Sequence, residues 1–255
     1  MPTSLQGRAQ KAESQKGYRF RNLYGMLDED FLKQCWRDIR KDAAAGVDQV
    51  SAQEYEQHLD ENIHRLVERL KQKRYRATLV RRHYMPQGDG PQRPLGIPAV
   101  EDKLLQLAVA RLLEAIYEQD FRRCSYGYRP HVGALDAVDT LTITLQFGRY
   151  AWVVEADIKK FFDTIDHDGM VQMLAERMDD GALLRLIRQW LKAGVLDTDG
   201  QVLHPATGTP PGGTVSPVLA HVFLHYVLDV WFATGVKQHW RSVSHAGCGR
   251  QRLRV

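Results

Sequence analysis

Apolar residues recur every three or four positions along several stretches of the chain, a spacing typical of helices with one buried face. In residues 101–120, for example, Leu104, Ala108 and Leu112 lie on one apolar stripe. Asp28 stands before another such stretch, where an aspartate can cap the first turn of a helix. The spacing predicts helices over 28–41, 52–73, 101–120, 133–146, after Asp166, over 181–193 and over 217–232.

Shorter stretches rich in Val, Ile, Tyr and Thr predict strands. Residues 78–86 and 93–97 flank a glycine- and proline-containing turn at 87–91, so together they predict a basic hairpin. Residues 150–156, with the sequence Tyr-Ala-Trp-Val-Val-Glu-Ala, predict a further strand that runs into Asp157. The chain therefore combines many helices with a few strands.

Composition narrows the class of protein. The 255 residues are 44% hydrophobic and 26% charged, which is typical of one large or two modest globular domains. The absence of an uninterrupted apolar run of about 18 residues predicts that no segment spans a membrane. The first 21 residues are polar and basic, unlike a secretory signal. Three cysteines without a Cys-x-x-Cys pair predict neither a disulfide framework nor a zinc knuckle, and favour a reducing, cytoplasmic location.

The formal net charge is only +4, but the charge is unevenly distributed. Residues 65–93 contain nine lysines and arginines and two acids. Such a block favours a polyanionic partner, bound through phosphate contacts and release of counterions. A solvated basic surface without a partner is the other interpretation.

Asp157 is the first candidate for chemistry, because a carboxylate at the end of an apolar strand can hold a divalent cation. Capping of the following turn is the simpler role for a single aspartate in this position. Lys159 and Lys160 follow it, and basic residues beside a metal carboxylate suit a polyphosphate. Phe161 and Phe162 come next, and either could pack against a sugar or belong to the core.

The loop at 207–217 is the second candidate. It is not a Walker loop, but Gly212 and Gly213 would let the backbone approach a ligand closely. The alternative is an ordinary loop before a helix, with Ser216 as the N-cap and Pro217 in the first turn.

Other polar residues carry weaker signals. Asp163, Asp166 and Asp168 could add metal ligands, although helix starts recruit aspartate for electrostatic reasons alone. His221 and His225 are spaced to bind zinc from one face of a helix, but no third ligand with a suitable spacing accompanies them.

Five segments, in this order, resemble the reverse transcriptase domain of group II intron-encoded proteins, the maturase-type reverse transcriptases. The resemblance covers residues 20–235. Each motif is weak alone, whereas the ordered set is highly specific. The segments are Gly46-Val-Asp48, Arg93-Pro-Leu-Gly-Ile-Pro98, Cys124-Ser-Tyr-Gly-Tyr-Arg-Pro130, Ala156-Asp-Ile-Lys-Lys-Phe-Phe-Asp163 and Gly208-Thr-Pro-Pro-Gly-Gly-Thr-Val-Ser-Pro217.

The resemblance implies an α+β, right-hand polymerase architecture, in which helices pack on an antiparallel sheet. It places fingers at 23–149 and part of a palm at 150–235. Residues 1–22 would form a flexible basic arm. Residues 236–255 would form an unstructured basic tail unrelated to the family.

The resemblance also implies a chemistry, in which two Mg²⁺ ions assist attack of a primer 3′-hydroxyl on a deoxynucleoside triphosphate. Asp157 matches the first metal-binding aspartate, with the carbonyl of Ile158 beside it. Phe162 matches the aromatic gate that excludes a ribose 2′-hydroxyl, and Arg93 matches the arginine that contacts the triphosphate.

Further residues are predicted to bind these substrates. The implied partners are an RNA template, intron RNA, a DNA primer and deoxynucleoside triphosphates, with no membrane. The predicted nucleotide-binding residues include Lys160, Phe161, Pro211 and Gly212. The predicted nucleic-acid-binding residues are Arg74, Arg76, Arg81, Arg82 and Arg129.

The chain departs from the family pattern in three places. Pro211 stands where the family usually has a glutamine that positions the nucleotide. Gln87 and Pro91 stand where the fingers hairpin usually carries lysines. The Tyr-Ala-Asp-Asp motif, which supplies a second metal-binding aspartate, is missing, and no Asp or Glu follows Phe232. These departures predict a truncated or frameshifted polymerase that is inactive alone.

Three functional classes therefore remain open. The chain could be the reverse transcriptase domain of a mobile intron protein, or a remnant that binds intron RNA through the arm and the 65–93 block without catalysis. It could also be a poorly folded product of a decayed element.

Overall fold

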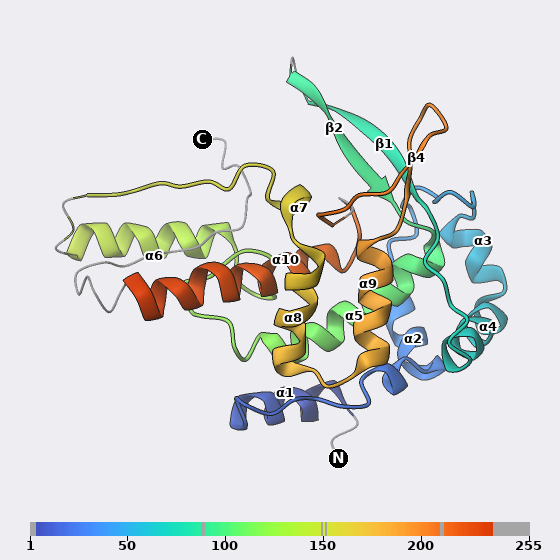
Figure 1. Ribbon diagram of the computed structural model, residues 1–255, viewed down its shortest axis with the longest axis horizontal. Helices are drawn as coiled ribbons and strands as arrows, with labels where there is room; N and C mark the ends of the chain where they lie inside the picture. The colour runs from blue at the N-terminus through green and yellow to red at the C-terminus, as the bar shows by residue number, and fades with distance from the viewer. Residues whose placement is uncertain (1–3, 88–89, 149, 151, 210–211, 237–255) are drawn as a thin grey trace.

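The computed structural model describes residues 4–87, 90–148, 150, 152–209 and 212–236, and the predicted tail at 237–255 lies outside them. Helices predominate, as Figure 1 shows. In chain order the elements are α1 Leu5–Ser14, η1 Tyr24–Met26, α2 Glu29–Trp36, α3 Ala52–Gln57, α4 Leu59–Lys71, β1 Val80–Gln87, β2 Gly90–Ile97, α5 Val100–Tyr117, α6 Ala134–Phe147, α7 Phe161–Thr164, α8 His167–Arg177, α9 Gly181–Leu191, β3 Val195–Leu196, β4 Val202–Leu203, α10 Ser216–Leu224, and the π-helical turns η2 His225–Val230 and η3 Phe232–Val236.

Side-chain caps explain where several helices begin. The Asp28 carboxylate accepts a hydrogen bond from the Phe31 amide at the start of α2. Asp166 caps α8 through the Gly169 amide. These two caps confirm the predictions made for both aspartates. Ser216 is instead the first residue of α10, one position later than the N-cap predicted for it.

The core is built around α5, which crosses the middle of the molecule (Figure 1). Leu104, Leu105 and Leu112 are fully buried. Helices α1, α2 and α10 pack against α5, while α8 packs against both α9 and α10. One continuous apolar core therefore joins the predicted fingers to the start of the predicted palm.

The sheet has four strands in the order β2-β1-β3-β4. Strands β1 and β2 form the predicted hairpin, with Arg81 opposite Ile97 and Met85 opposite Arg93. Strand β3 lies parallel to β1 and antiparallel to β4. The α+β class is confirmed, but the sheet is mixed, so the prediction of an antiparallel sheet is wrong in this respect. The parallel pair joins Val80 to Val195 and Arg81 to Leu196.

The predicted strand at 150–156 is absent from the described residues. Residues 152–158 are extended, but their backbone pairs with no strand described in the structure. Trp152 is 89% exposed and Val154 is 90% exposed. Figure 1 shows this segment as a long trace above α6. A strand needs a neighbour to satisfy its backbone, and none of the four strands that the structure describes pairs with this segment.

Residues 5–14 form helix α1, where the sequence analysis predicts a flexible arm. Ala12 is fully buried, and the helix packs on α5. The Arg19 guanidinium donates to the Ala175 carbonyl at 2.9 Å. The Phe20 amide donates to the Arg177 carbonyl at 2.8 Å. Most of the arm is therefore part of the folded body.

One helical stretch, Ser216–Gly235, is long and apolar enough to cross a membrane by length and composition alone. Its mean hydropathy is 1.3, and 39% of the window is buried. Core helices of soluble proteins pass the same test, so the prediction of no membrane span stays a prediction.

Candidate functional site

The five motif segments, which are far apart in the sequence, contact one another in the structure. Gly46 lies directly against the end of β2, because a Cβ added there would be 2.6 Å from the Ala99 Cα and 2.9 Å from the Pro98 carbonyl carbon. Real Cβ atoms never approach so closely, so only glycine fits. The Arg81 guanidinium secures this contact by donating to the Ala45 carbonyl at 2.6 Å.

The loop at 207–213 is bonded to the segment that follows Asp157. The Thr209 amide donates to the Phe162 carbonyl, and the Gly208 amide donates to the Ile165 carbonyl, each at 2.8 Å. The His167 ring is buried, and its Nε2 lies 2.7 Å from the Gly208 carbonyl oxygen. The fourth and fifth motif segments are therefore held together by backbone hydrogen bonds.

Gly212 joins the same loop to β2. Its φ of +99° is a conformation that residues with a Cβ rarely adopt. A Cβ there would overlap the Gly96 carbonyl oxygen and lie 3.1 Å from the Leu95 side chain. Side chains alternate between the faces of a strand, so Arg93 lies on the same face of β2 as Leu95. The predicted triphosphate contact, Arg93, thus belongs to the face of the hairpin that meets the loop.

Replacing Gly212 with alanine is expected to destabilise the protein by about 2–4 kcal/mol, because backbone strain and overlap with Gly96 add together. Gly200 is a matched control, since its φ is +85° but nothing lies within 4 Å of an added Cβ. Gly200→Ala should therefore cost only about 1–2 kcal/mol. Urea denaturation of both variants measures the difference, and equal costs would contradict the contact.

The third motif segment completes the cluster. The Tyr128 ring meets the Phe162 ring edge to face, with centroids 5.9 Å apart. Phe161 packs on the other side against Phe223, at 6.1 Å. Phe161 is therefore anchored to α10, as expected of a core aromatic, while Phe162 is shared between three motif segments. The structure brings together a residue from every segment of the ordered set.

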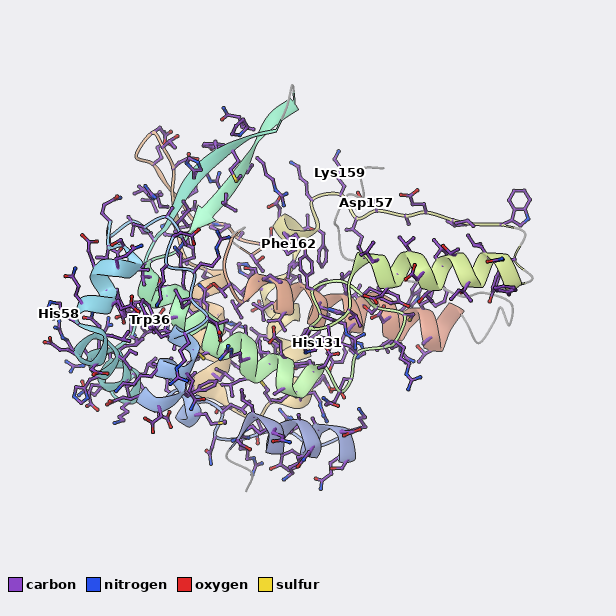
Figure 2. The ribbon with its side chains drawn as sticks, turned by 180° about the vertical axis from the view of Figure 1, so that it is seen from behind. Trp36, His58, His131, Asp157, Lys159 and Phe162 are labelled. Atoms are coloured by element: carbon purple, nitrogen blue, oxygen red, sulfur yellow. The ribbon has the colours of Figure 1, made fainter. Side chains whose placement is uncertain are left out.

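Asp157 lies on the extended segment, close in sequence to this cluster, and Figure 2 labels it together with Lys159 and Phe162. The residues from 152 to 160 are all exposed. Lys160 has a φ of +52° and directs the chain into α7, where its carbonyl accepts from the Asp163 amide at 2.9 Å. Pro211 lies outside the described residues.

Among the described residues, Asp157 is not joined by enough ligands to form a metal centre. No group of three or more His, Cys, Asp or Glu side chains suited to a metal ion occurs in the part of the chain that the structure describes. Hard divalent cations require several oxygen ligands. Asp157 and the Ile158 carbonyl, both on an exposed segment, supply too few for two Mg²⁺ ions.

The predicted nucleic-acid-binding arginines of β1 already have partners within the protein. Arg82 points to the opposite face from Arg93, and its guanidinium is 3.5 Å from the Asp197 carboxylate. The Tyr84 hydroxyl donates to the same carboxylate at 3.1 Å. Backbone and side-chain hydrogen bonds, led by that from the Thr198 amide, hold the pKa of Asp197 below its usual range.

Arg129 is similarly engaged. Its guanidinium pairs with the Glu118 carboxylate at 2.5 Å and donates to the Ser125 carbonyl at 2.7 Å. Its charge also lies 5.8 Å from the centre of the Phe121 ring. These bonds shape the loop that presents Tyr128, which gives Arg129 a structural role beside its predicted one.

The sequence pattern does not indicate a buried polar network that lines the same cavity as the loop. The Asp102 carboxylate accepts hydrogen bonds from the Tyr75 hydroxyl, the Thr78 hydroxyl and the Thr78 amide, the last at 3.1 Å. The Trp190 indole donates to the Tyr75 hydroxyl at 3.0 Å. Burial raises the pKa of Asp102, and the bonds from Thr78 and Tyr75 oppose this effect. Asp102 lies in the first turn of α5, where acids are common for electrostatic reasons, so its place in the sequence does not reveal its part in this network.

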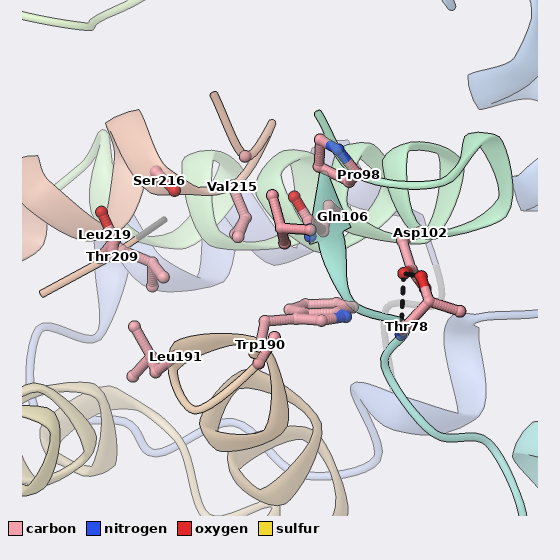
Figure 3. Close-up of a pocket in the computed structure, with 13 residues that line it drawn as sticks. Thr78, Pro98, Asp102, Gln106, Trp190, Leu191, Thr209, Val215, Ser216 and Leu219 are labelled. Atoms are coloured by element: carbon pink, nitrogen blue, oxygen red, sulfur yellow. Dashed lines mark hydrogen bonds between the residues drawn. The ribbon is translucent and has the colours of Figure 1, made fainter. Parts of the chain in front are cut away.

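Figure 3 shows the small cavity, of about 20 Å³, that this network borders. Thr209 and Ser216 reach it from the motif loop, and Gln106 reaches it from α5. The network and the loop that contacts β2 and α7 therefore line the same cavity.

The reverse transcriptase (RNA-dependent DNA polymerase) family model matches residues 82–234, more than half of the chain. The chain belongs to the reverse transcriptase family. Within it, the chain is a reverse transcriptase domain related to the group II intron-encoded protein LtrA of Lactococcus lactis subsp. cremoris. The two are 35% identical over 208 residues, which cover 81% of this chain and 34% of LtrA.

Protein YkfC of Escherichia coli (strain K12) is 33% identical over 183 residues, covering 71% of this chain and 48% of YkfC. The chain thus spans between a third and a half of the length of these two relatives. Among solved structures, a chain of the "Partial Cas6-RT-Cas1--Cas2 complex" matches 83% of this chain with a TM-score of 0.53 and 22% identity. At this identity the likeness concerns the fold alone.

Proposed function

We propose that this chain supplies the fingers and the beginning of the palm of an RNA-directed DNA polymerase of the group II intron type. In this proposal it binds an RNA template with a DNA primer, and Arg93, Lys159 and Lys160 contact phosphates. It also binds intron RNA, as expected of a maturase relative, and acts in the cytoplasm. The 255-residue chain binds nucleic acid but does not extend a primer.

The convergence of the five motif segments carries the proposal. Gly46 contacts Pro98, Gly212 contacts Gly96, and Phe162 contacts both Thr209 and Tyr128. A merely decayed chain has no reason to retain glycines at the places where backbones meet. The intact contacts therefore favour a folded binding surface over a poorly folded product.

Two observations support the proposed lack of catalysis: the small number of predicted metal-binding carboxylates, and the extended segment that carries Asp157. Metal-assisted transfer of a nucleotide uses two cations, about 3.5–4 Å apart, that contact the attacking and leaving oxygens. Asp157 is the single predicted metal-binding carboxylate, and the sequence contains no Tyr-Ala-Asp-Asp. Residues 152–158, which contain it, pair with no strand in the described structure.

Two assays on the same preparation test the proposal. Fluorescence anisotropy with a labelled RNA–DNA template–primer should show binding that weakens steeply with salt. Arg93→Gln combined with Lys160→Gln should weaken it about tenfold or more, since contacts to charged groups are worth about 1.5–3 kcal/mol each. Arg40→Gln is the control, because Arg40 is exposed and pairs with Asp42.

Primer extension with Mg²⁺ and deoxynucleoside triphosphates should remain at background. Extension that depends on the template would disprove the lack of catalysis. Equal weakening of binding by the double variant and by Arg40→Gln would disprove the assigned contacts.

A further inference from the structure

A second cavity, of about 260 Å³, lies away from the five motif segments. It is formed where the chain leaves α4 and passes α9, with Tyr24 of η1 at its edge. None of the lining residues belongs to a motif segment. In Figure 1, α4 lies at the end of the molecule opposite α6, whereas Asp157 precedes α7 on the segment beside α6.

Three cationic side chains line this cavity, and no acid does. They are Lys73 and Arg76 from the link after α4, and Arg185 from α9. Arg76 is held in place because its Nη1 donates to the Tyr75 carbonyl at 2.8 Å and to the Lys73 carbonyl at 3.2 Å. Ala182 and Leu186 add apolar surface.

The cations of the cavity differ from several basic residues of α4 and α9 in having no carboxylate partner in the described structure. In the described structure, no carboxylate oxygen lies within 4.0 Å of the charged nitrogens of Lys73, Arg76 or Arg185. Several basic residues of α4 and α9 are paired with carboxylates. These pairs are Arg65–Glu61, Arg69–Glu101, Lys71–Glu68 and Arg188–Asp168.

The acid bonded to the Tyr24 amide, Asp180, already has several hydrogen-bond partners. The Asp180 carboxylate caps α9 by accepting from the Ala182 and Leu183 amides, each at 3.1 Å, and it accepts from the Tyr24 amide at 2.9 Å. It does not line the cavity. Burial raises the pKa of the Tyr24 hydroxyl, and the positive charge of Arg185 opposes this effect. The field in the cavity therefore remains positive.

We propose that this cavity binds a phosphate group, carried either by the backbone of an RNA or by a small phosphate compound. Convergent lysine and arginine side chains without a counter-charge are what phosphate recognition requires. The volume is below the range of about 300–1,000 Å³ typical of whole drug-sized ligands, which favours one or two phosphates over an entire nucleotide. The site does not depend on catalysis or on the contacts proposed for Arg93 and Lys160.

Isothermal titration calorimetry with inorganic pyrophosphate at low salt tests the site directly. Arg185→Gln and Lys73→Gln should each weaken binding about tenfold or more. Lys192→Gln is the matched control, since it removes the same charge at the end of the same helix without lining the cavity, and it should change the affinity less than twofold. All three positions are exposed, so melting temperatures should stay unchanged.

A parallel titration with a 20-nucleotide RNA identifies the source of the phosphate. If RNA occupies the cavity, pyrophosphate competes with it, and Arg185→Gln weakens both ligands. If a small phosphate compound is the ligand, RNA binding is unaffected and no competition occurs. The proposal fails if neither ligand responds to Arg185→Gln and Lys73→Gln more than to Lys192→Gln, a result that leaves the template–primer assay unaffected.

Discussion

Replacing Arg177 with methionine is expected to lower the free energy of unfolding by about 3–5 kcal/mol, the cost of leaving one buried ion without its partner. The Arg177 side chain is 4% exposed and lies 2.9 Å from the Asp120 carboxylate, which is 13% exposed. Its guanidinium also donates to the carbonyls of Ala12 and Gln15, at 3.1 and 3.0 Å. One side chain therefore joins the end of α8 to the N-terminal helix.

Urea denaturation followed by tryptophan fluorescence measures this cost, and limited proteolysis reports release of residues 5–20. Arg188→Gln is the control, because Arg188 and Asp168 are 41% and 71% exposed and such pairs contribute about 0–1 kcal/mol. Combining Arg177→Met with Asp120→Asn should recover part of the loss, since the buried carboxylate is then removed too. A cost below about 1 kcal/mol for Arg177→Met would contradict the described role.

The N-terminal residues show why this anchor could not be predicted from the sequence. Lys11, Lys16 and Arg19 indicate a solvated basic segment when they are considered alone. Two of these side chains have partners that are distant in the chain, since Arg19 reaches Ala175 and Lys16 lies 3.6 Å from Asp120. Tertiary contacts of this kind override local composition, and no periodic pattern reveals them.

The segment at 150–156 shows the opposite case, in which local sequence preference predicts a strand that the described structure does not contain. Its Val and Trp residues have the intrinsic preference of a strand, and their pattern predicts one. A strand forms only beside another strand, because its backbone groups must be satisfied from outside. Local preference could therefore predict the extended conformation of residues 152–158, but not whether a neighbour would be present.

The candidate site could be predicted from the sequence in part. The order of the motifs indicates which segments matter, and the glycines of the loop indicate close backbone approach. The structure adds the partner of each approach, for instance Gly96 for Gly212. Arg82 and Arg93 look equivalent as charges, but their opposite faces on the hairpin and the pairing of Arg82 with Asp197 separate them. Motifs can be found in the sequence, whereas the contacts that motifs make across the fold are seen only in the structure.

A buried histidine cluster on α10 and η2 makes the stability of this protein sensitive to acid. The His221 ring is 2% exposed and stacks on Phe121 with centroids 3.9 Å apart. Its Nε2 lies 2.9 Å from the Ser125 hydroxyl oxygen. Burial lowers the pKa of His221 to about 4, with Asp229 opposing the shift. The remaining charged groups that act on His221 or on its neighbour His225 are Asp120, Arg122 and Arg129.

Acidification from pH 7 to pH 4 should therefore cost about 3 kcal/mol of stability through His221 alone. The unfolded chain takes up a proton near pH 6.5, whereas the folded protein does so only near pH 4, so stability is present above pH 6.5 and is lost between these values. Burial lowers the pKa of His225 as well, which adds a loss of stability in the same direction.

His221→Gln should flatten the pH dependence of the urea midpoint relative to the unmodified protein. His58→Gln, at an exposed position (Figure 2), should leave it unchanged, and equal curves for all three proteins would refute the role of His221.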